Sequence, residues 1–252
     1  MVLLRYYQQM EALTFNELEA GFGYPGYQVD YLCNIGARHS FLYFETPKVA
    51  CSSIKRTLQL LEGANLQDAG SNVHDKSQST LKGALSLGWT FEQIFFSSRL
   101  FRFTFVRNPY ARALSCYLEK IVADEGERGR HQAWLGFFQA QPVSFLQFLQ
   151  AVDRIADRDR DIHWRSQAML INDQHIQYNY IGRFESLQRD FPQVLDHLGI
   201  DREKAPLLDI SHHKTNASAR LQEFYGPDEE ALARKIYHSD FLRFGYSFEI
   251  PG

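Results

Sequence analysis

The sequence has no apolar run long enough to cross a lipid bilayer. Its longest apolar stretches, such as AWLGFF, are far shorter than the roughly 20 residues that a spanning helix needs. The N-terminal MVLLRYYQQMEALTF has only a short apolar stretch and no small-residue cleavage site, so we expect no signal peptide. The net charge of −3 excludes a general attraction to nucleic acid or anionic membranes. We therefore expect a soluble protein whose anion sites are local.

Cysteine is also scarce. The three cysteines, Cys33, Cys51 and Cys116, are odd in number and lack CxxC spacing, which excludes a disulfide framework and a zinc site of the usual kind. Reduced thiols of this kind are typical of the cytoplasm, where we expect the protein to act. The 252 residues contain no internal repeat, so we predict one domain, with an N-terminal extension at 1–39 and a core at 40–248.

Glycine is missing where it would be most informative. The stretch FLYFETPKVACSSIKRTL (41–58) has the layout of a strand, a turn and a helix, as in a phosphate-binding loop. A Walker A loop needs GxxxxGK[ST], whereas here Lys48 stands at the front of the turn and no glycine follows. No acidic strand end offers a magnesium site, so we expect no metal. The turn is either an anion site or an ordinary turn with a surface lysine.

A second strand end carries a similar set of residues. The segment FRFTFVR (101–107) alternates aromatic and polar residues, and Asn108-Pro109 then opens a helix that carries Ser115. The Arg107 guanidinium and the Ser115 hydroxyl are suited to a second phosphate, although an ion pair and a packing residue are equally simple readings. Two anion sites on neighbouring strand ends would imply a ligand with two separated anionic groups.

Strands alternate with helices along the chain. Apolar runs at 40–45, 101–107 and 178–185 predict strands, and helices are expected near 6–20, near 77–87, at 185–198 and from Pro227 to Phe244. This order predicts an α/β fold with a central parallel sheet flanked by helices, whose ligands bind beyond the carboxyl ends of the strands.

Several motifs together resemble a known family. PKVACSSIKRTL and FVRNPYARALSCY, followed by DIHWRSQ, YNYIGRFESLQRD and YHSDFLRFGY, are similar to sulfotransferase motifs, as is NVHDK between the first two. The similarity is closest to the carbohydrate group (sulfotransferase family 2) that includes Golgi chondroitin and HNK-1 enzymes, and heparan sulfate 2-O-sulfotransferase is more distant. The resemblance covers 41–248. It implies a P-loop-like fold and 3′-phosphoadenosine 5′-phosphosulfate as donor, without a metal.

The resemblance also implies roles for particular residues. The turn would hold the 5′-phosphosulfate, with Lys48 near the bridging oxygen, while Arg107 and Ser115 would bind the 3′-phosphate. Lys214 and Asn216, in the loop HHKTNAS, are further candidates for the donor site. The turn residues expected to bind the donor are Lys48, Val49, Ala50, Cys51, Ser52 and Ser53.

The acceptor side is less well defined. The resemblance points to His74 as the general base that takes the proton of the acceptor hydroxyl, with Glu45 as the second candidate. His163, Arg183 and Glu45 are expected near the acceptor. Glu185 would either orient Arg183 or form a plain ion pair with it.

The resemblance predicts transfer of a sulfuryl group to a hydroxyl, on a carbohydrate or glycoconjugate, by in-line displacement. Golgi relatives have a membrane anchor and luminal cysteines, and we expect neither feature in this chain. It is therefore expected to be a soluble, bacterial-type member. No nucleic-acid partner is expected, and the acceptor and the oligomeric state stay open. The alternatives are a metal-dependent kinase with a degenerate P-loop and a non-catalytic binding protein for 3′-phosphoadenosine nucleotides.

Overall fold

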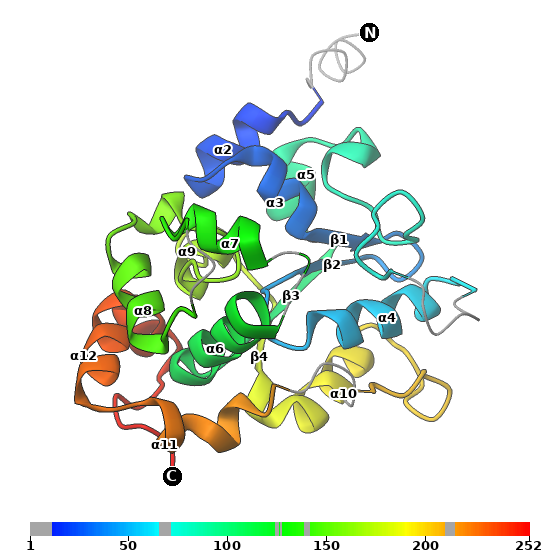
Figure 1. The fold of residues 1–252 in the computed structure, drawn as a ribbon. Helices are drawn as coiled ribbons and strands as arrows, with labels where there is room; N and C mark the ends of the chain where they lie inside the picture. Colours follow the sequence, from blue (N-terminus) through cyan, green and yellow to red (C-terminus); the bar gives the residue numbers. More distant parts are fainter. Residues whose placement is uncertain (1–11, 66–71, 124–125, 127, 139–141, 210–214) are drawn as a thin grey trace, which may run out of the picture.

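A four-stranded sheet forms the centre of the described part of the chain (Figure 1). The computed structural model describes residues 12–65, 72–123, 126, 128–138, 142–209 and 215–252. The strands follow one another in the sheet in chain order: β1 (Cys33–Gly36), β2 (Phe41–Phe44), β3 (Phe101–Val106) and β4 (Tyr180–Arg183). β1 pairs antiparallel with β2, whereas the β2–β3 and β3–β4 pairs are parallel.

One face of the sheet is aromatic and lies under two helices. Phe41 and Tyr43 of β2 and Phe103 and Phe105 of β3 are fully buried. Their rings pack on one another, with 5.3 Å between the centroids of Tyr43 and Phe103, and this face is covered by α4 (Cys51–Leu61) and α10 (Leu187–His197). Aromatic side chains favour strands because they fit a pleated, buried surface, which explains why this alternation was readable in the sequence.

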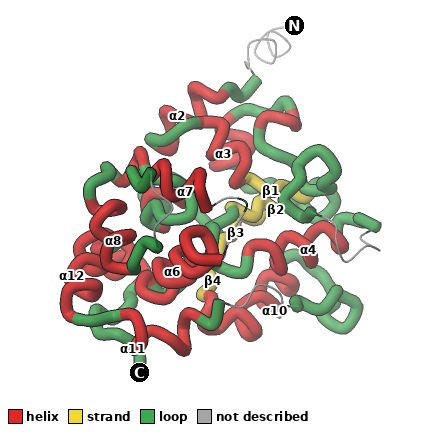
Figure 2. The backbone as a smooth tube through the Cα atoms, viewed as in Figure 1, coloured by secondary structure: helices red, strands yellow, loops and turns green. Residues whose placement is uncertain are grey.

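The opposite face carries Leu42, Phe44 and Val106, which are also buried. Helices from both halves of the chain cover it: α2 (Phe15–Phe22), α3 (Gly26–Leu32), α5 (Phe91–Phe95) and α9 (Gln167–Ile171). Figure 2 shows the strands in the middle with helices on either side. The predicted class, an α/β fold with a central, mostly parallel sheet flanked by helices, is confirmed.

A second helical layer packs beside the sheet around a separate apolar cluster. Its elements are α6 (Pro109–Cys116), the π-helix η3 (Tyr117–Ala123), α7 (Arg128–Trp134), α8 (Phe145–Asp153), α11 (Leu221–Phe224), α12 (Pro227–Ile236) and α13 (His238–Phe244). Short 3₁₀ turns complete the connections: η2 (Leu85–Leu87), η4 (Asp157–Asp159), η5 (Phe184–Ser186) and η6 (Ala217–Arg220).

Two expected helices differ from the structure. Only Leu85–Leu87 of the stretch near 77–87 is helical, because Lys82 exchanges both backbone hydrogen bonds with Ile35 of β1, at 2.9 Å each. The expected helix from Pro227 to Phe244 is divided into α12 and α13 at the buried Tyr237, whose hydroxyl donates to the Trp164 carbonyl. Of the helix expected near 6–20, residues 1–11 lie outside the described residues, and α2 begins at Phe15.

Candidate active site

The sheet brings the two predicted turns to the same edge. β2 and β3 are parallel neighbours, with Tyr43 opposite Phe103, so their carboxyl ends lie side by side. α4 starts soon after β2, and α6 starts soon after β3. Side chains and N–H groups at these two helix starts therefore face a common region.

The turn after β2 obtains its shape without glycine. Lys48 and Ala50 both adopt the left-handed conformation, with φ of 72° and 55°. For residues other than glycine this conformation costs roughly 1–2 kcal/mol each. No side chain caps α4 among the described residues, so the first N–H groups of this helix, from Cys51 to Ser53, remain suited to an anion.

Lys48 is paired with a carboxylate that the sequence did not reveal. Its buried ammonium forms an ion pair with Glu119 of η3, which also contacts Lys120 at 3.2 Å. Burial alone would raise the pKa of Glu119, but the neighbouring Lys48 and Lys120 together outweigh burial and lower it to about 2. Lys48 is therefore a preformed cation that an anionic ligand would have to draw away from Glu119.

Arg107 connects the two turns directly. Its Nη1 donates to the Lys48 carbonyl at 3.1 Å and its Nη2 donates to the Ser218 hydroxyl at 3.0 Å, while the guanidinium lies 4.2 Å from the centre of the Phe184 ring. The third donor, Nε, is buried and has no partner among the described residues. Burial lowers the pKa of Arg107 to about 10, with Glu185 opposing the shift, so the side chain is a fixed cation whose Nε–H has no partner among the described residues.

Ser115 is hydrogen-bonded to the segment that also contacts Arg107. It is buried on α6 and accepts a hydrogen bond from Thr215 at 3.1 Å. Thr215 and Ser218 flank the start of η6, in the segment where Lys214 and Asn216 were expected to contact the donor. Lys214 lies outside the described residues, so its role stays a prediction.

These groups fit a ligand with two anionic ends. One end is served by Lys48 and the start of α4, and the other by a buried arginine with an unused N–H and three hydroxyls. Charge-assisted hydrogen bonds of this kind are worth about 1.5–3 kcal/mol each.

His74 lies over the first turns of α4. Its Nε2 is 2.8 Å from the Ser52 hydroxyl, and its Nδ1 is 2.6 Å from Nζ of Lys55. Burial, followed by the charge of Lys55, lowers the pKa of His74 to about 4, against the opposing effect of Glu45. The imidazole is therefore neutral at neutral pH.

Glu45 is buried beneath His74 at the end of β2. Its carboxylate lies 2.8 Å from the Lys55 ammonium and 3.7 Å from Nδ1 of His74. Burial would raise the pKa of Glu45, but Lys55 and His74 together lower it to about 2. The carboxylate is ionised and inaccessible, so it supports the His74 cluster from below, and its expected contact with the acceptor stays a prediction.

His163 is held by a neighbouring carboxylate. Its Nδ1 lies 2.6 Å from Oδ1 of Asp161, and 23 % of its side chain is accessible. The buried guanidinium of Arg112 places this segment near the turn after β2, because it donates to the carbonyls of Pro47 at 3.0 Å and Ile162 at 3.1 Å. The structure thus brings Lys48, His74 and His163 to the same region.

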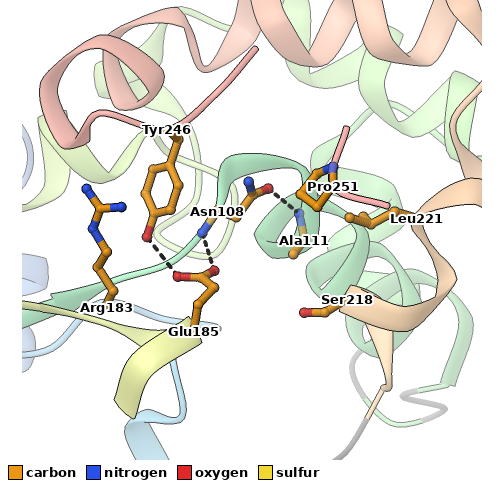
Figure 3. Close-up of a pocket in the computed structure, with 8 residues that line it drawn as sticks. All are labelled: Asn108, Ala111, Arg183, Glu185, Ser218, Leu221, Tyr246 and Pro251. Carbon is orange, nitrogen blue, oxygen red and sulfur yellow. Dashed lines mark hydrogen bonds between the residues drawn. The ribbon is translucent and has the colours of Figure 1, made fainter. Parts of the chain in front are cut away.

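Arg183 and Glu185 hold the C-terminal segment. Glu185 accepts from the Asn108 N–H at 2.7 Å and from the Tyr246 hydroxyl at 2.9 Å, while the guanidinium of Arg183 lies 4.8 Å from the centre of the Tyr246 ring. No ion pair joins Arg183 to Glu185 among the described residues. Both line a cavity of about 190 Å³. Figure 3 shows them with the other lining residues, Asn108, Ala111, Ser218, Leu221, Tyr246 and Pro251. A contact of Arg183 with the acceptor stays a prediction.

Sequence reasoning missed several of these groups. Asp161 had a local signal, since it stands two residues before His163 in DIHW, and Ser218 and Thr215 lay in a segment already noted as rich in hydroxyls. Lys55 and Arg112 had weaker signals, because the partners of Lys55 lie 10 and 19 residues away in the sequence and those of Arg112 lie 50 or more residues away. Glu119 had none.

Two kinds of feature are absent from the described ranges. These residues contain no group of three or more His, Cys, Asp or Glu side chains arranged to hold a metal ion. Likewise, none of their helices is long and apolar enough to cross a membrane.

Comparison with known proteins gives consistent matches over most of the chain. The chain is 29% identical to human carbohydrate sulfotransferase 8, over 83% of this chain and 54% of that protein. It is 26% identical to mouse carbohydrate sulfotransferase 12, over 97% of this chain and 67% of the relative. Zebrafish carbohydrate sulfotransferase 14 is 31% identical over 84% of this chain and 61% of the relative.

The chain thus spans about half to two thirds of the length of these relatives. No solved structure gives a significant match. The sequence profile of the sulfotransferase family matches residues 33–247, which include both turns, His74 and His163. The chain belongs to the sulfotransferase family.

Proposed function

We propose that this protein transfers a sulfuryl group from 3′-phosphoadenosine 5′-phosphosulfate to a hydroxyl of a carbohydrate or glycoconjugate. The observation that carries the proposal is the bond from the Arg107 guanidinium to the Lys48 carbonyl, which joins two anion-binding turns at one sheet edge. The donor has two anionic ends, the phosphosulfate and the 3′-phosphate, and each turn supplies donors for one of them. Membership of the sulfotransferase family supports the same donor.

The phosphosulfate would lie on the turn from Lys48 to Ser53, where Lys48 and the N–H groups of α4 stabilise negative charge on the leaving phosphate. Lys48 must exchange its contact with Glu119 for one with the bridging oxygen. The 3′-phosphate would be bound by Arg107, Ser115 and the hydroxyls beside them, with Lys214 as an additional cation.

The acceptor is proposed to be a carbohydrate because the relatives are named carbohydrate sulfotransferases. Transfer needs a base for the proton of the acceptor hydroxyl. His74 stays a candidate for this base, and His163, Glu45 and Arg183 stay candidates for contacts on the acceptor side.

A thermal-shift experiment tests the donor site. Adenosine 3′,5′-bisphosphate at about 100 times its Kd is expected to stabilise the protein by about 2.7 kcal/mol, or roughly 5–10 °C in Tm. Arg107→Ala should remove most of this shift, whereas Arg189→Ala, on the exposed face of α10, should leave it intact. Stabilisation by magnesium-ATP alone would instead indicate the kinase alternative, and binding without any sulfate transfer would indicate a binding protein.

We also propose that the protein acts in the cytoplasm. The support is that Cys33, Cys51 and Cys116 are all free thiols, and two of them are buried. Fractionation of cells that express the chain tests this proposal.

A further inference from the structure

His74 and His163, the two histidines near the turn after β2, differ in the group that contacts Nδ1. In His74 the contact is the Lys55 ammonium at 2.6 Å, which is held in place by the buried carboxylate of Glu45. An ammonium only donates hydrogen bonds, so Nδ1 of His74 must accept. The neutral ring then carries its proton on Nε2, and this N–H donates to the Ser52 hydroxyl at 2.8 Å.

His74 in this arrangement has no free lone pair with which to take the proton of the acceptor hydroxyl. Its Nδ1 is occupied by Lys55, and its Nε2 carries a proton that points at the first turn of α4. The low pKa of His74, about 4, keeps this form neutral. A neutral imidazole with a fixed Nε2–H is a hydrogen-bond donor, suited to an oxygen of the group bound on the turn.

His163 has the opposite arrangement. A carboxylate only accepts hydrogen bonds, and Asp161 lies 2.6 Å from Nδ1 of His163, so the ring proton is on Nδ1 and the lone pair is on Nε2. Asp161 also accepts from the His163 backbone N–H at 2.9 Å, which fixes the orientation of the residue. Burial would raise the pKa of Asp161, but the hydrogen bonds and charge of His163, with a contribution from His131, together lower it to about 2, so the carboxylate stays ionised.

The location of His163 fits a base for a hydroxyl that attacks the group bound on the turn after β2. One guanidinium, that of Arg112, binds the carbonyls of the residues that precede Lys48 and His163. His163 also acts electrostatically on His74, whose pKa it lowers. The ring of His131 stands edge-on to His163 at 5.6 Å between centroids and leaves part of the His163 side chain accessible.

We propose that His163, oriented by Asp161, is the general base for the acceptor hydroxyl, and that His74 is a neutral hydrogen-bond donor to the sulfuryl group or its leaving oxygen. This inference rests on the proposed function. Nε2 of His163 takes the proton as the hydroxyl oxygen bonds to sulfur. The bond between sulfur and the bridging oxygen breaks, and its electron pair stays on the 5′-phosphate. The products are the sulfate ester, adenosine 3′,5′-bisphosphate and an imidazolium that releases its proton to water.

Tautomer measurement tests the inference without any acceptor. In protein labelled with ¹⁵N-histidine, long-range ¹H–¹⁵N spectra at pH 7.5 should show His163 protonated on Nδ1 and His74 on Nε2. The variants His163→Gln and His74→Gln assign the signals among the nine histidines. In Asp161→Asn the Nδ1–H form of His163 should lose its dominance, because Asp161 is the positioning residue. An Nε2–H form of His163 in the unmodified protein would overturn the proposal.

Kinetics of matched variants test the catalytic roles. Glutamine keeps an N–H near the position of Nε2 but cannot take a proton at neutral pH. We therefore expect His163→Gln to lower kcat by about 10²–10⁴-fold, with partial rescue by added imidazole. His74→Gln should retain turnover within about tenfold, and imidazole should not improve it. The control is His175→Ala, an exposed histidine that contacts only Asn172 among the described residues, and it should leave kcat unchanged.

Transfer is measured with ³⁵S-labelled donor and a panel of neutral and acidic oligosaccharides. The pH profile of kcat/KM should lose its acidic limb in His163→Gln but keep it in His74→Gln. The charged or titratable groups that act on His74 are Lys55, Glu45, His163, Lys120 and the Tyr31 hydroxyl, which lies 3.5 Å from Nδ1. Those beside His163 are Asp161 and His131. Apart from the substituted histidine itself, these groups are the same in both variants. The reverse pattern, with His74→Gln inactive and His163→Gln active, overturns this inference and returns the base to His74. Absence of transfer by the unmodified protein, together with no stabilisation by adenosine 3′,5′-bisphosphate, overturns the proposed function itself.

Discussion

The two histidine segments are attached to different helices and to charges of opposite sign. His74 is bound to α4 through Ser52 and Lys55, whereas His163 lies in a segment bound to α6 through Arg112. The cation beside His74 and the carboxylate beside His163 place the ring protons on opposite nitrogens. The comparison shows that a histidine near a reaction centre acquires its role from the partner at Nδ1. Its position alone does not decide whether it acts as an acid, a base or a hydrogen-bond donor.

The largest effect on turnover is expected from substitution of Lys48, which lies in the turn after β2. Lys48→Met should lower kcat by about 10²–10³-fold, because this cation is the side chain placed for the oxygen that leaves. The tautomers of both histidines should stay unchanged, since neither contacts Lys48. Labelled sulfate transfer and histidine NMR measure the two quantities.

Lys82→Met is the matched control for Lys48→Met, because Lys82 is an exposed lysine that donates to the Ser79 carbonyl. Turnover of Lys48→Met close to that of this control would show that the leaving oxygen is stabilised elsewhere.

An effect of intermediate size is expected on the pH dependence of stability, because the His74 and His163 segments lose stability in different pH windows. The folded-state pKa of His74 is about 4, below the value of 6.5 for a free histidine, so the unfolded chain binds the proton first. Stability should therefore fall as pH drops from 6.5 to 4. For Asp161 the folded pKa is about 2 against 3.8, so its contribution is complete above 3.8 and is lost as pH falls towards 2.

Scanning calorimetry of variants checks these two windows. Because His74 is about one third exposed, we expect its contribution to be about 1–2 kcal/mol, or roughly 2–8 °C in Tm. His74→Gln should flatten the loss between pH 6.5 and 4, whereas Asp161→Asn should change stability at pH 7 and reduce the loss below pH 4. The lowered pKa of His131 adds to the first window in all of these proteins. Equal slopes for His74→Gln and the unmodified protein would contradict the low pKa of His74.

The sequence predicted the sheet well because its signals are local. Phe101, Phe103 and Phe105 alternate with polar residues, and this pattern depends only on the pleat of a strand. β1 was missed, although it pairs with the neighbouring β2, and the helix expected near 77–87 is confined to Leu85–Leu87 for a non-local reason. The backbone of Lys82 bonds to Ile35, 47 positions earlier in the chain, and no local pattern announces such a pairing.

The candidate site shows the same contrast between local sequence signals and long-range contacts. Lys48 and Arg107 were identified because each lies shortly after a strand, and strand ends gather at one edge of a parallel sheet. Lys55 was read only as part of a helix, although its ammonium determines the tautomer of His74. Ser52, expected in the turn that binds the donor, lies inside the first turn of α4, because the helix begins at Cys51 with Ala50 in the capping position. The charge environment of each histidine thus arises from tertiary contacts that spacing does not encode.

The smallest effect is expected at Ser218, which contacts Arg107 and neither histidine. Ser218→Ala removes one hydroxyl beside the proposed 3′-phosphate site, and a single hydrogen bond contributes about 0.5–1.5 kcal/mol. Binding of adenosine 3′,5′-bisphosphate, measured by calorimetry, should weaken by about 2–12-fold, while kcat at saturating donor and both tautomers stay the same. Ser247→Ala, a hydroxyl that accepts only from the Glu249 N–H among the described contacts, is the control. A fall in kcat with unchanged affinity would mean that this end of the site is coupled to the histidines, and the separation between donor binding and proton transfer would then fail.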